Sequence, residues 1–570
     1  MNLEHLIENP LELDADGVWV RPNAKPFGYT DGRASEEYLE RVLAAAADLG
    51  SNSRELTAAI KDWPSEYHLS PTRAQLLRGF DYDRGKRVLE VGCGCGAITR
   101  FLGETFDSVT SIEGSHARAR LARMRTRDLD HVTIVNSPFE EIRFSAKFDI
   151  VFCIGVFEYA SMFVEGDDPH RKILAHFDHL LAPGGVLVLA IENKLGLKYF
   201  SSSAEDHTGV MFDGVEGYPR FARKAKTFGR RELVERLEPH FESIEFLYPW
   251  PDYKIPSCVL SEPLLERVDP TELIGSFRSV DYGHRARQPL FDESLAWRSL
   301  VANGLTASMA HSFLVVATKA PRTGLRLDCA GRLYSSHRRR PEFATLTRFE
   351  DAEKGLDVVK ARADGSPEFV EGKLAHRACS DTWIEGASLQ DTMARRARAR
   401  GMDLTTMLEP TRIWFDELDG TANGDGRVPG ERLDSIWRNC FVTEDGCRYI
   451  DREWAWTDPL PLTLIVARGL YYFAQSLLDA PSLNPTLARM RIDAFIAEAG
   501  AAYGLTLDAD ELAALTRFEA AFLDQVTGSS KDRVTDVSAV LRRRLSTRRP
   551  GSPSSLPRRG ARWLKRRLRR

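Results

Sequence analysis

Long apolar runs, secretory features and paired cysteines are all missing from this sequence. No apolar run reaches the roughly 20 residues that a membrane-spanning helix needs. Residues 1–10 contain two glutamates and no basic cluster, unlike a secretory signal. The eight cysteines are scattered without a C-x-x-C pair, which argues against a zinc site and for reduced thiols. We therefore expect a cytoplasmic protein.

The composition is that of a globular protein with more than one core. The chain has 570 residues, 43% of them hydrophobic and 28% charged, and one hydrophobic core rarely supports such a length. The formal net charge of −4 is unevenly distributed. Residues 542–570 contain 13 Lys and Arg and no Asp or Glu, which leaves −17 on the remainder. An acidic body therefore precedes a basic tail.

A nucleotide-binding turn is predicted at residues 88–97, which read V-L-E-V-G-C-G-C-G-A. The apolar start is typical of a buried strand, and a helical pattern follows. Gly92, Gly94 and Gly96 allow the backbone to turn sharply against a ligand. The same turn, with Ala97, also satisfies the G-x-G-x-x-A dinucleotide fingerprint, so an NAD site stays open on this pattern alone.

Two acidic residues favour a different cofactor. Glu90 lies inside the first strand, where a dehydrogenase strand is normally apolar, and Glu113 ends the next apolar run. With the glycines, they resemble motif I and the following acidic residue of the class I S-adenosylmethionine (SAM) methyltransferases. The resemblance implies that the backbone at residues 92–96 faces the methionine carboxylate of SAM. It also implies that Glu113 binds the ribose hydroxyls and that Phe139 lies against the adenine ring.

Seven strand candidates alternate with helical patterns from residue 86 onward, as expected for a doubly wound α/β sheet. They span residues 87–91, 108–112, 132–136, 148–154, 185–191, 244–248 and 312–318. We therefore predict a Rossmann-like methyltransferase domain at residues 86–320, preceded by a helical cap at residues 1–85. The long connection at residues 249–310 is interpreted as a lid on the substrate side, because loops of this length are usually functional or disordered.

Polar residues cluster where the predicted fourth and fifth strands end, the edge at which open α/β sheets bind ligands. Glu158 follows the fourth strand, Glu192 ends the fifth, and His207 comes shortly after it. We interpret Glu158 as a neighbour of the cofactor, and Glu192 and His207 as catalytic candidates. An imidazole can take a proton from a hydroxyl nucleophile near neutral pH, although a lone histidine is more often structural.

Five separated blocks resemble a bacterial methyltransferase family associated with surface-polysaccharide biosynthesis, whose members are often fused to glycosyltransferase or kinase-like modules. The blocks are residues 67–73, 88–99, 192–199, 205–209 and 248–256. The resemblance implies a glycan or glycan-phosphate as the methyl acceptor, presented as a lipid-linked glycan, and glycan-assembly proteins as partners. With a phosphate acceptor no general base is needed, and His207 would bind rather than deprotonate.

A second module is predicted at residues 322–530, where the spacing resembles aminoglycoside- and choline-kinase-like proteins. Asp434 precedes Asn439 by five positions, as the base and the metal asparagine do in H-R-D-x-x-x-x-N, and Asp451 follows twelve later. Lys360 resembles the third-strand lysine. The resemblance implies an α+β kinase-like domain with Asp434 as base, Lys360 on ATP, and Asn439 and Asp451 on Mg²⁺. No glycine-rich phosphate loop is visible, so an inactive scaffold stays open.

The last 40 residues, 531–570, are rich in Arg, Ser and Pro and are predicted to be disordered. Trp563, Leu564 and Leu568 lie among basic residues there, which suits the anionic inner face of the plasma membrane. We therefore predict a peripherally membrane-associated SAM-dependent methyltransferase that acts on a surface-glycan intermediate. The alternatives are an RNA methyltransferase that uses the basic tail and a non-catalytic nucleotide-binding scaffold. Residues 1–530 show no RNA-binding module, so nucleic acid is not the expected partner.

Overall fold

Two compact units make up the chain, and each has its own hydrophobic core. The first comprises residues 1–287, 297–337 and 346–357, and the second comprises residues 288–296, 338–345 and 358–570. The computed structural model describes residues 6–22, 27–28, 30, 32–221, 224–282, 289–320, 325–353, 355–478, 480–528 and 536–546. Most of the predicted basic tail and residues 283–288 of the predicted lid therefore lie outside the described residues.

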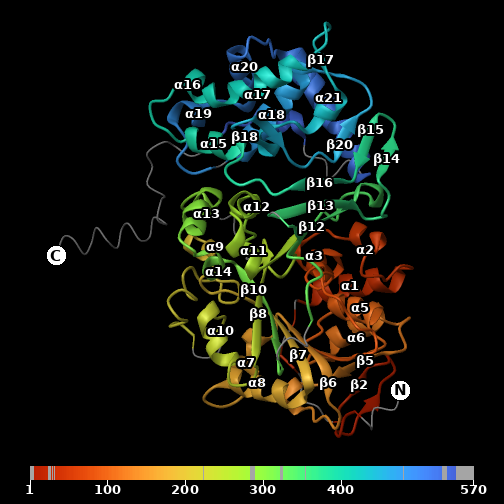
Figure 1. The fold of residues 1–570 in the computed structure, drawn as a ribbon. Helices are drawn as coiled ribbons and strands as arrows, with labels where there is room; N and C mark the ends of the chain where they lie inside the picture. Colours follow the sequence, from red (N-terminus) through yellow and green to blue (C-terminus); the bar gives the residue numbers. More distant parts are fainter. Residues whose placement is uncertain are drawn as a thin grey trace, which may run out of the picture. The chain divides into compact units, whose positions relative to one another are not determined.

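The first unit is built on a sheet that contains all seven predicted strands (Figure 1). They are β3 (Arg87–Val91), β4 (Ser108–Glu113), β5 (Val132–Asn136), β6 (Phe148–Ile154), β7 (Leu181–Glu192), β8 (Ser243–Trp250) and β10 (Ser312–Thr318). Their order is β5-β4-β3-β6-β7-β10-β8, and β10 runs antiparallel to both of its neighbours. The predicted α/β fold is confirmed for this unit.

Helices cover both faces of this sheet, which is why nearly all residues of its central strands are buried. Helices α5 (Ala97–Thr105) and α6 (His116–Arg125) lie on one side, and α8 (Pro169–Leu180) and α10 (Arg230–Leu237) lie on the other (Figure 1). The strand order reverses direction between β3 and β6. A crevice for a ligand is expected at the carboxyl ends of these two strands.

The N-terminal region differs from the predicted helical cap. Strands β1 (Glu12–Leu13) and β2 (Trp19–Val20) form a hairpin, and β2 pairs in parallel with β5 at the edge of the sheet. Helical structure follows in α1 (Arg33–Ala45), α2 (Arg54–Ala58), α3 (Trp63–Leu69) and α4 (Thr72–Gln75). Residues 1–85 therefore extend the sheet as well as covering it.

The connection at residues 249–310 has more regular structure than a simple lid. Strand β9 (Cys258–Ser261) pairs with β8, and α11 (Glu262–Arg267), α12 (Thr271–Gly275), α13 (Glu293–Ala302) and α14 (Thr306–Met309) follow. Strand β11 (Gly331–Tyr334) pairs with β9 and with β12 (Thr345–Asp351). The domain boundary predicted near residue 322 is therefore displaced, because β11 and most of β12 belong to the first unit.

The second unit combines short strands with a helical core. Its strands are β13 (Leu356–Arg362), β14 (Glu368–Glu371), β15 (Leu374–Arg377), β16 (Cys379–Thr382), β17 (Arg427–Val428), β18 (Cys440–Thr443), β19 (Gly446–Tyr449), β20 (Trp454–Trp456) and β21 (Leu460–Pro461). Its helices are α15 (Leu389–Arg396), α16 (Leu404–Leu408), α17 (Arg412–Gly420), α18 (Leu462–Ser476), α19 (Pro485–Arg489), α20 (Ile492–Ala502), α21 (Ala509–Thr527) and α22 (Val537–Leu541). The α+β content agrees with the prediction, whereas a kinase-like fold stays a prediction. Among the described residues, no helix is long and apolar enough to cross a bilayer.

Candidate active site

The glycine turn joins β3 to α5 in a left-handed backbone conformation. Gly92, Gly94 and Gly96 have φ angles of +74°, +56° and +83°, a region that residues with a Cβ rarely adopt. The amide of Gly92 donates a hydrogen bond to the carbonyl of Ile112 (2.8 Å), which fixes the turn against β4. A Cβ on Gly96 would lie 2.8 Å from the Cα of Ala122. Glycine at this position therefore also permits α6 to pack closely.

Glu113, at the end of β4, holds this turn in place. Its Oε2 accepts a hydrogen bond from the amide of Gly94 (2.8 Å), and its Oε1 accepts one from the amide of Ser115 (2.9 Å). Each carboxylate oxygen can accept more than one hydrogen bond. The carboxylate therefore retains acceptor capacity for the ribose hydroxyls that the sequence assigns to it.

Glu90, in the middle of β3, ties neighbouring elements together. Its Oε2 accepts hydrogen bonds from the hydroxyls of Thr99 and Ser111, both at 2.7 Å. Burial raises the pKa of Glu90 to about 7, although the two hydrogen bonds oppose this shift. The side chain also lines the cavity described next. Glu90 thus connects β3 to α5 and β4 beneath the predicted cofactor.

A cavity of about 570 Å³ opens at the carboxyl ends of the parallel strands. This volume is within the usual range of small-molecule sites. The glycine turn, Glu113 and Phe139, which follow β3, β4 and β5, line one part of it. The ring of Phe139 packs against Phe177, with centroids 5.3 Å apart. A polar turn, a carboxylate and an aromatic ring fit the methionine, ribose and adenine parts of SAM, which supplies an electrophilic methyl group when bound.

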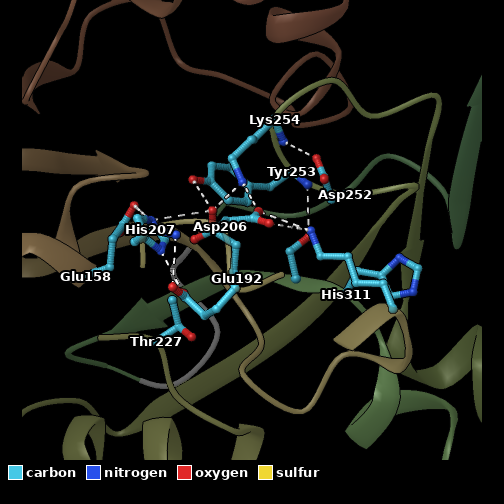
Figure 2. Close-up of polar contacts among 12 residues, drawn as sticks. Glu158, Glu192, Asp206, His207, Thr227, Asp252, Tyr253, Lys254 and His311 are labelled. Atoms are coloured by element: carbon cyan, nitrogen blue, oxygen red, sulfur yellow. Dashed lines mark hydrogen bonds and ion pairs between the residues drawn. The ribbon is translucent and has the colours of Figure 1, made fainter. Parts of the chain in front are cut away.

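Three side chains from different elements converge in the other part of the cavity (Figure 2). Glu158 belongs to the 3₁₀ turn η3 (Phe157–Tyr159) after β6, Glu192 is the last residue of β7, and His207 follows α9 (Leu197–Phe200). Nε2 of His207 lies 3.7 Å from Oε1 of Glu158 and 3.8 Å from Oε1 of Glu192. The structure therefore brings the predicted cofactor neighbour Glu158 together with the two catalytic candidates, Glu192 and His207.

Glu205 orients the ring of His207. Its Oε1 lies 3.0 Å from Nδ1 of His207, and its Oε2 accepts hydrogen bonds from the amides of His207 (2.9 Å) and Thr208 (2.6 Å). The hydroxyl of Tyr218 donates a further hydrogen bond to Oε1 (3.3 Å). Because Nδ1 is engaged by Glu205, Nε2 is the ring atom that faces Glu158 and Glu192.

The charge of His207 does not support the predicted role as a general base. Burial alone would lower the pKa of His207, but Glu192, Glu158 and Glu205 raise it well above its usual value. In this arrangement the ring is a cation near neutral pH, so it cannot take a proton from a hydroxyl. The alternative role, in which His207 binds rather than deprotonates, agrees with this geometry.

Two lysines and an aspartate complete this part of the site. Lys254 pairs with Glu192 and with Asp206 (Nζ to Oδ2, 2.6 Å), and Lys198 also pairs with Asp206 (3.1 Å). Burial would raise the pKa of both carboxyl groups, but the neighbouring cations hold it below the usual value. No role is predicted for these three residues from the sequence, although all of them lie within the blocks that resemble the polysaccharide family. Only the fold brings them within ion-pair distance.

Aromatic side chains form another wall of the cavity. Trp63 and Tyr67 of α3 and Tyr282 of the 249–310 connection line it. The ring centroids of Trp63 and Tyr282 are 4.0 Å apart, and those of Trp63 and Tyr67 are 5.5 Å apart. The connection that was predicted to be a substrate-side lid therefore contributes a side chain to the cavity, next to two from α3.

The second unit brings Lys360 on β13 into contact with Asp451, and Nζ lies 3.5 Å from Oε2 of Glu453. Asp451 has a φ of +58°, a strained conformation that is common at functional sites. Glu453 is buried and pairs with Arg339 (2.9 Å) and His376 (3.3 Å). Burial would raise the pKa of Glu453, but Lys360 and Arg339 hold it well below the usual range.

Asp434 and Asn439 end the 3₁₀ turns η6 (Gly430–Asp434) and η7 (Trp437–Asn439). Nδ2 of Asn439 donates to the backbone carbonyl (3.0 Å) and the carboxylate (3.1 Å) of Asp434. The amide of Ile450, beside Asp451, donates to the carbonyl of Asn439 (2.9 Å). The predicted kinase-like residues thus form one connected group, but Asp434 is buried and pairs with Arg468 (3.2 Å).

The stretch between β13 and β16 departs from the kinase pattern. The hairpin β14–β15 occupies it, and among the described residues no helix lies there to present a glutamate to Lys360. Glu453 takes that place instead.

Known proteins similar to this chain match its first unit. A family model described as a methyltransferase domain matches residues 89–187, from β3 into β7. The ubiquinone biosynthesis O-methyltransferase of Nitrosococcus oceani is 26% identical over 178 residues, which cover 30% of this chain and 72% of that protein. The cyclopropane-fatty-acyl-phospholipid synthase of Escherichia coli is 29% identical over 106 residues, which cover 18% of this chain and 26% of that protein.

Among solved structures, the N-methyltransferase NodS of Bradyrhizobium japonicum, in complex with S-adenosyl-L-homocysteine, is 20% identical with a TM-score of 0.24. The alignment covers 39% of this chain and 93% of that one. The family match coincides with the glycine turn, Glu113 and the cavity at the strand ends. The chain therefore contains a class I SAM-dependent methyltransferase domain, and SAM is the cofactor of this enzyme.

Proposed function

We propose that the enzyme transfers the methyl group of SAM to an oxygen of a lipid-linked surface-glycan intermediate. The observation that supports this proposal most directly is the lining of the acceptor part of the cavity. There an aromatic wall stands beside a dense group of ionised side chains. A sugar ring has apolar faces that pack on aromatic rings and a rim of hydroxyls that hydrogen-bond to charged groups.

A flat apolar acceptor fits this lining less well. It would cover Oε2 of Glu158 and Oε2 of Glu192, which have no hydrogen-bond partner among the described residues, without offering them a donor. Buried polar groups without partners cost free energy. The aromatic rings of Trp63, Tyr67 and Tyr282 alone would suit such an acceptor. The charged groups beside them therefore favour a polyhydroxylated or phosphorylated acceptor over a quinone-like one.

The side chains of the site would act mainly by positioning the methyl acceptor. Holding an acceptor oxygen in line with the methyl carbon supplies much of the acceleration of a displacement reaction. Lys254 and the cationic His207 are placed to bind an oxygen that already bears negative charge. A glycan phosphate has such an oxygen and needs no deprotonation, which agrees with the charge of His207.

A fractionation experiment tests the acceptor. The purified enzyme is incubated with SAM labelled in its methyl group and with separate fractions of lipid-linked glycan, RNA and free quinone precursors from a bacterial extract. We expect label in the glycan fraction, released with the sugar when the lipid-linked phosphate is hydrolysed. Label that enters only the RNA or only the quinone fraction would contradict the proposal and favour the corresponding alternative.

The second unit is proposed to be a kinase-like domain that binds ATP and Mg²⁺. The connected group of Lys360, Asp451, Asn439 and Asp434 supports this role. We expect calorimetry to detect ATP binding in the presence of Mg²⁺ and a loss of at least about tenfold in affinity, or 1.4 kcal/mol, in Asp451→Asn. Asp425→Asn, in an exposed loop of the same unit, is the matched control. Absence of ATP binding in the wild type would leave this unit as a scaffold.

A further inference from the structure

Two carboxylate oxygens in the acceptor part of the cavity are buried without a partner. They are Oε2 of Glu158 and Oε2 of Glu192, for which the described residues offer no hydrogen bond. The side chains are 1% and 0% exposed. A buried oxygen of this kind carries a free-energy penalty. A ligand that contacts both carboxylates would remove the penalty.

The ring of His207 is oriented so that it can contact the same ligand. Metal-bound histidines usually donate the N–H of the other ring nitrogen to a carboxylate, which fixes the tautomer and the ring orientation. Here Nδ1 lies 3.0 Å from Glu205, whose other oxygen accepts two backbone amides. Nε2 is thereby presented to Glu158 and Glu192 (Figure 2).

The spacing of these groups suits an ion better than hydrogen bonds. One ligand atom from each of Glu158, Glu192 and His207 lies within 4.8 Å of the others. The separations of 3.7 and 3.8 Å from Nε2 to the two carboxylates are too long for hydrogen bonds. Ligand atoms bound at about 2.0–2.2 Å to one ion lie roughly 3–3.5 Å apart. The two distances from Nε2 would therefore need to shorten by only a few tenths of an ångström to reach this range.

The formal charges around this point also favour a bound cation. Glu158, Glu192, Glu205 and Asp206 surround this point, and the ion pairs of Lys198 and Lys254 balance two of these four carboxylates. A bound ion would replace the proton on Nε2 of His207, so the imidazole is neutral in the metal complex and the group then has an excess of two negative charges. One divalent cation would neutralise this excess.

We propose that Glu158, Glu192 and His207 bind one divalent transition-metal ion beside the SAM site. One imidazole and two carboxylates suit Mn²⁺, Fe²⁺ or Zn²⁺ better than Ca²⁺ or Mg²⁺, which prefer oxygen ligands alone. Three protein ligands leave positions open for another molecule. If the proposed function is correct, the acceptor oxygen occupies one of these positions, so this last step rests on that proposal.

Metal titration of the full-length protein tests the site. The protein is stripped with a chelator and titrated with Mn²⁺, and free Mn²⁺ is followed by electron paramagnetic resonance. We expect one ion per chain, displaced by Zn²⁺ and not by equal Mg²⁺. Glu158→Gln, Glu192→Gln and His207→Gln should each weaken binding roughly 100-fold or more. Glu205→Gln should weaken it about 10- to 100-fold, because this residue acts through the orientation of His207.

The same substitutions at ion pairs outside the cavity are the controls. Glu235→Gln, beside Arg231, and His240→Gln, beside Asp178, should leave Mn²⁺ affinity unchanged. Far-ultraviolet circular dichroism and urea unfolding verify that each variant remains folded. If the wild type binds neither Mn²⁺ nor Zn²⁺ stoichiometrically, the proposal is wrong whatever the variants do. Unchanged metal binding in all three ligand variants would also overturn it.

The titration needs no methyl acceptor, so its outcome is independent of the proposed function. If these residues bind the metal but the glycan fraction is not labelled, the proposed acceptor is wrong and the proposed ion site stands. Labelled glycan from a protein that binds neither Mn²⁺ nor Zn²⁺ would contradict the ion site alone.

Discussion

At the scale of single residues, the backbone conformation of the glycine turn disfavours a side chain beside the cofactor. Gly94 has a φ of +56°, and a Cβ there would lie 2.8 Å from Nη2 of Arg118. Its amide donates to Glu113, so a side chain would also disturb the ribose-binding carboxylate. We expect Gly94→Asp to weaken SAM binding at least about tenfold, because left-handed strain alone costs roughly 1–2 kcal/mol and the new carboxylate would repel that of methionine.

Calorimetry with SAM measures this effect. Gly304→Ala is the matched control, because Gly304 has a similar φ of +68° but nothing within 4 Å of an added Cβ. This variant should bind SAM like the wild type although it has the same backbone strain. Normal SAM affinity in Gly94→Asp would refute the assignment of the turn to the cofactor.

Buried Glu90 gives the first unit a pH-dependent stability. Its pKa is raised from 4.5 to about 7, so the folded state favours the protonated form. Because the folded pKa exceeds the unfolded one, the stabilisation is complete below about pH 4.5 and is lost as the pH rises through about 7. The loss corresponds to roughly 3 kcal/mol. We expect Glu90→Gln, which is always neutral, to lose less unfolding free energy than the wild type between pH 5 and pH 8.

Urea unfolding at the two pH values measures this difference. Glu235→Gln, at a surface ion pair, is the control and should follow the wild type. An identical pH dependence in the wild type and Glu90→Gln would show that the carboxyl group is ionised throughout this range.

The candidate site could be predicted from the sequence only in part. Glu192 ends β7 and Glu158 lies in the turn that follows β6, so their place at one edge of the sheet is predictable from the strand pattern. Lys254 is 62 residues away from its partner Glu192, and no local pattern indicates that they meet. The charge of His207 depends on three carboxylates from separate segments, so it could not be inferred before the fold was known.

At the scale of elements, the hairpin β1–β2 contributes to the core mainly through Val18, and Val20 packs against the same core. Val18, next to β2, is 0% exposed, whereas Leu13 on β1 is 56% exposed. We expect Val18→Ala to lower the free energy of unfolding by about 2 kcal/mol, because it leaves a cavity in the core. Leu13→Ala, the matched control, should change it by less than about 0.5 kcal/mol. Equal effects of the two substitutions in urea unfolding would show that the hairpin is not packed against the sheet.

How clearly an element appears in the residue pattern depends on its length and on how much of it is buried. Each of the seven predicted strands has at least four consecutive buried residues, because the sheet is covered on both faces. Strands β1 and β2 have two residues each and are partly exposed, so they give no periodic pattern. Helix α3 does have a signal, the capping box of Asp62 and Ser65, which could have identified residues 63–69 as a helix.

At the scale of the whole molecule, the described chain has two separate polar sites in two separately packed units. The methyltransferase cavity lies in the first unit, and the group around Lys360 and Asp451 lies in the second. Because the units have separate cores, a substitution at one site is expected to leave ligand binding at the other intact. Retained SAM affinity in Asp451→Asn is therefore a further control for the ATP experiment.

The basic tail can be removed without disturbing the second core if the truncation begins after Ser546. Leu545 is 0% exposed, and its amide donates to the carbonyl of Met490 (3.0 Å). A deletion from residue 542 would remove this buried side chain, and a loss of function could then reflect unfolding. Residues 547–570 still contain 10 of the basic residues.

We propose that this tail binds the enzyme to an anionic membrane surface, where each basic residue contributes on the order of 1 kcal/mol. The full chain should sediment with vesicles of phosphatidylglycerol and phosphatidylethanolamine, and 0.5 M NaCl should release it because salt screens the charges. Deletion of residues 547–570 should abolish sedimentation, while SAM binding shows that the protein remains folded. Replacing Trp563, Leu564 and Leu568 by Ser keeps every charge and should weaken sedimentation only in part, if these side chains act as apolar anchors. Equal sedimentation of the full and truncated chains would contradict a membrane role for the tail, since the basic residues that distinguish the two proteins would then contribute nothing to binding.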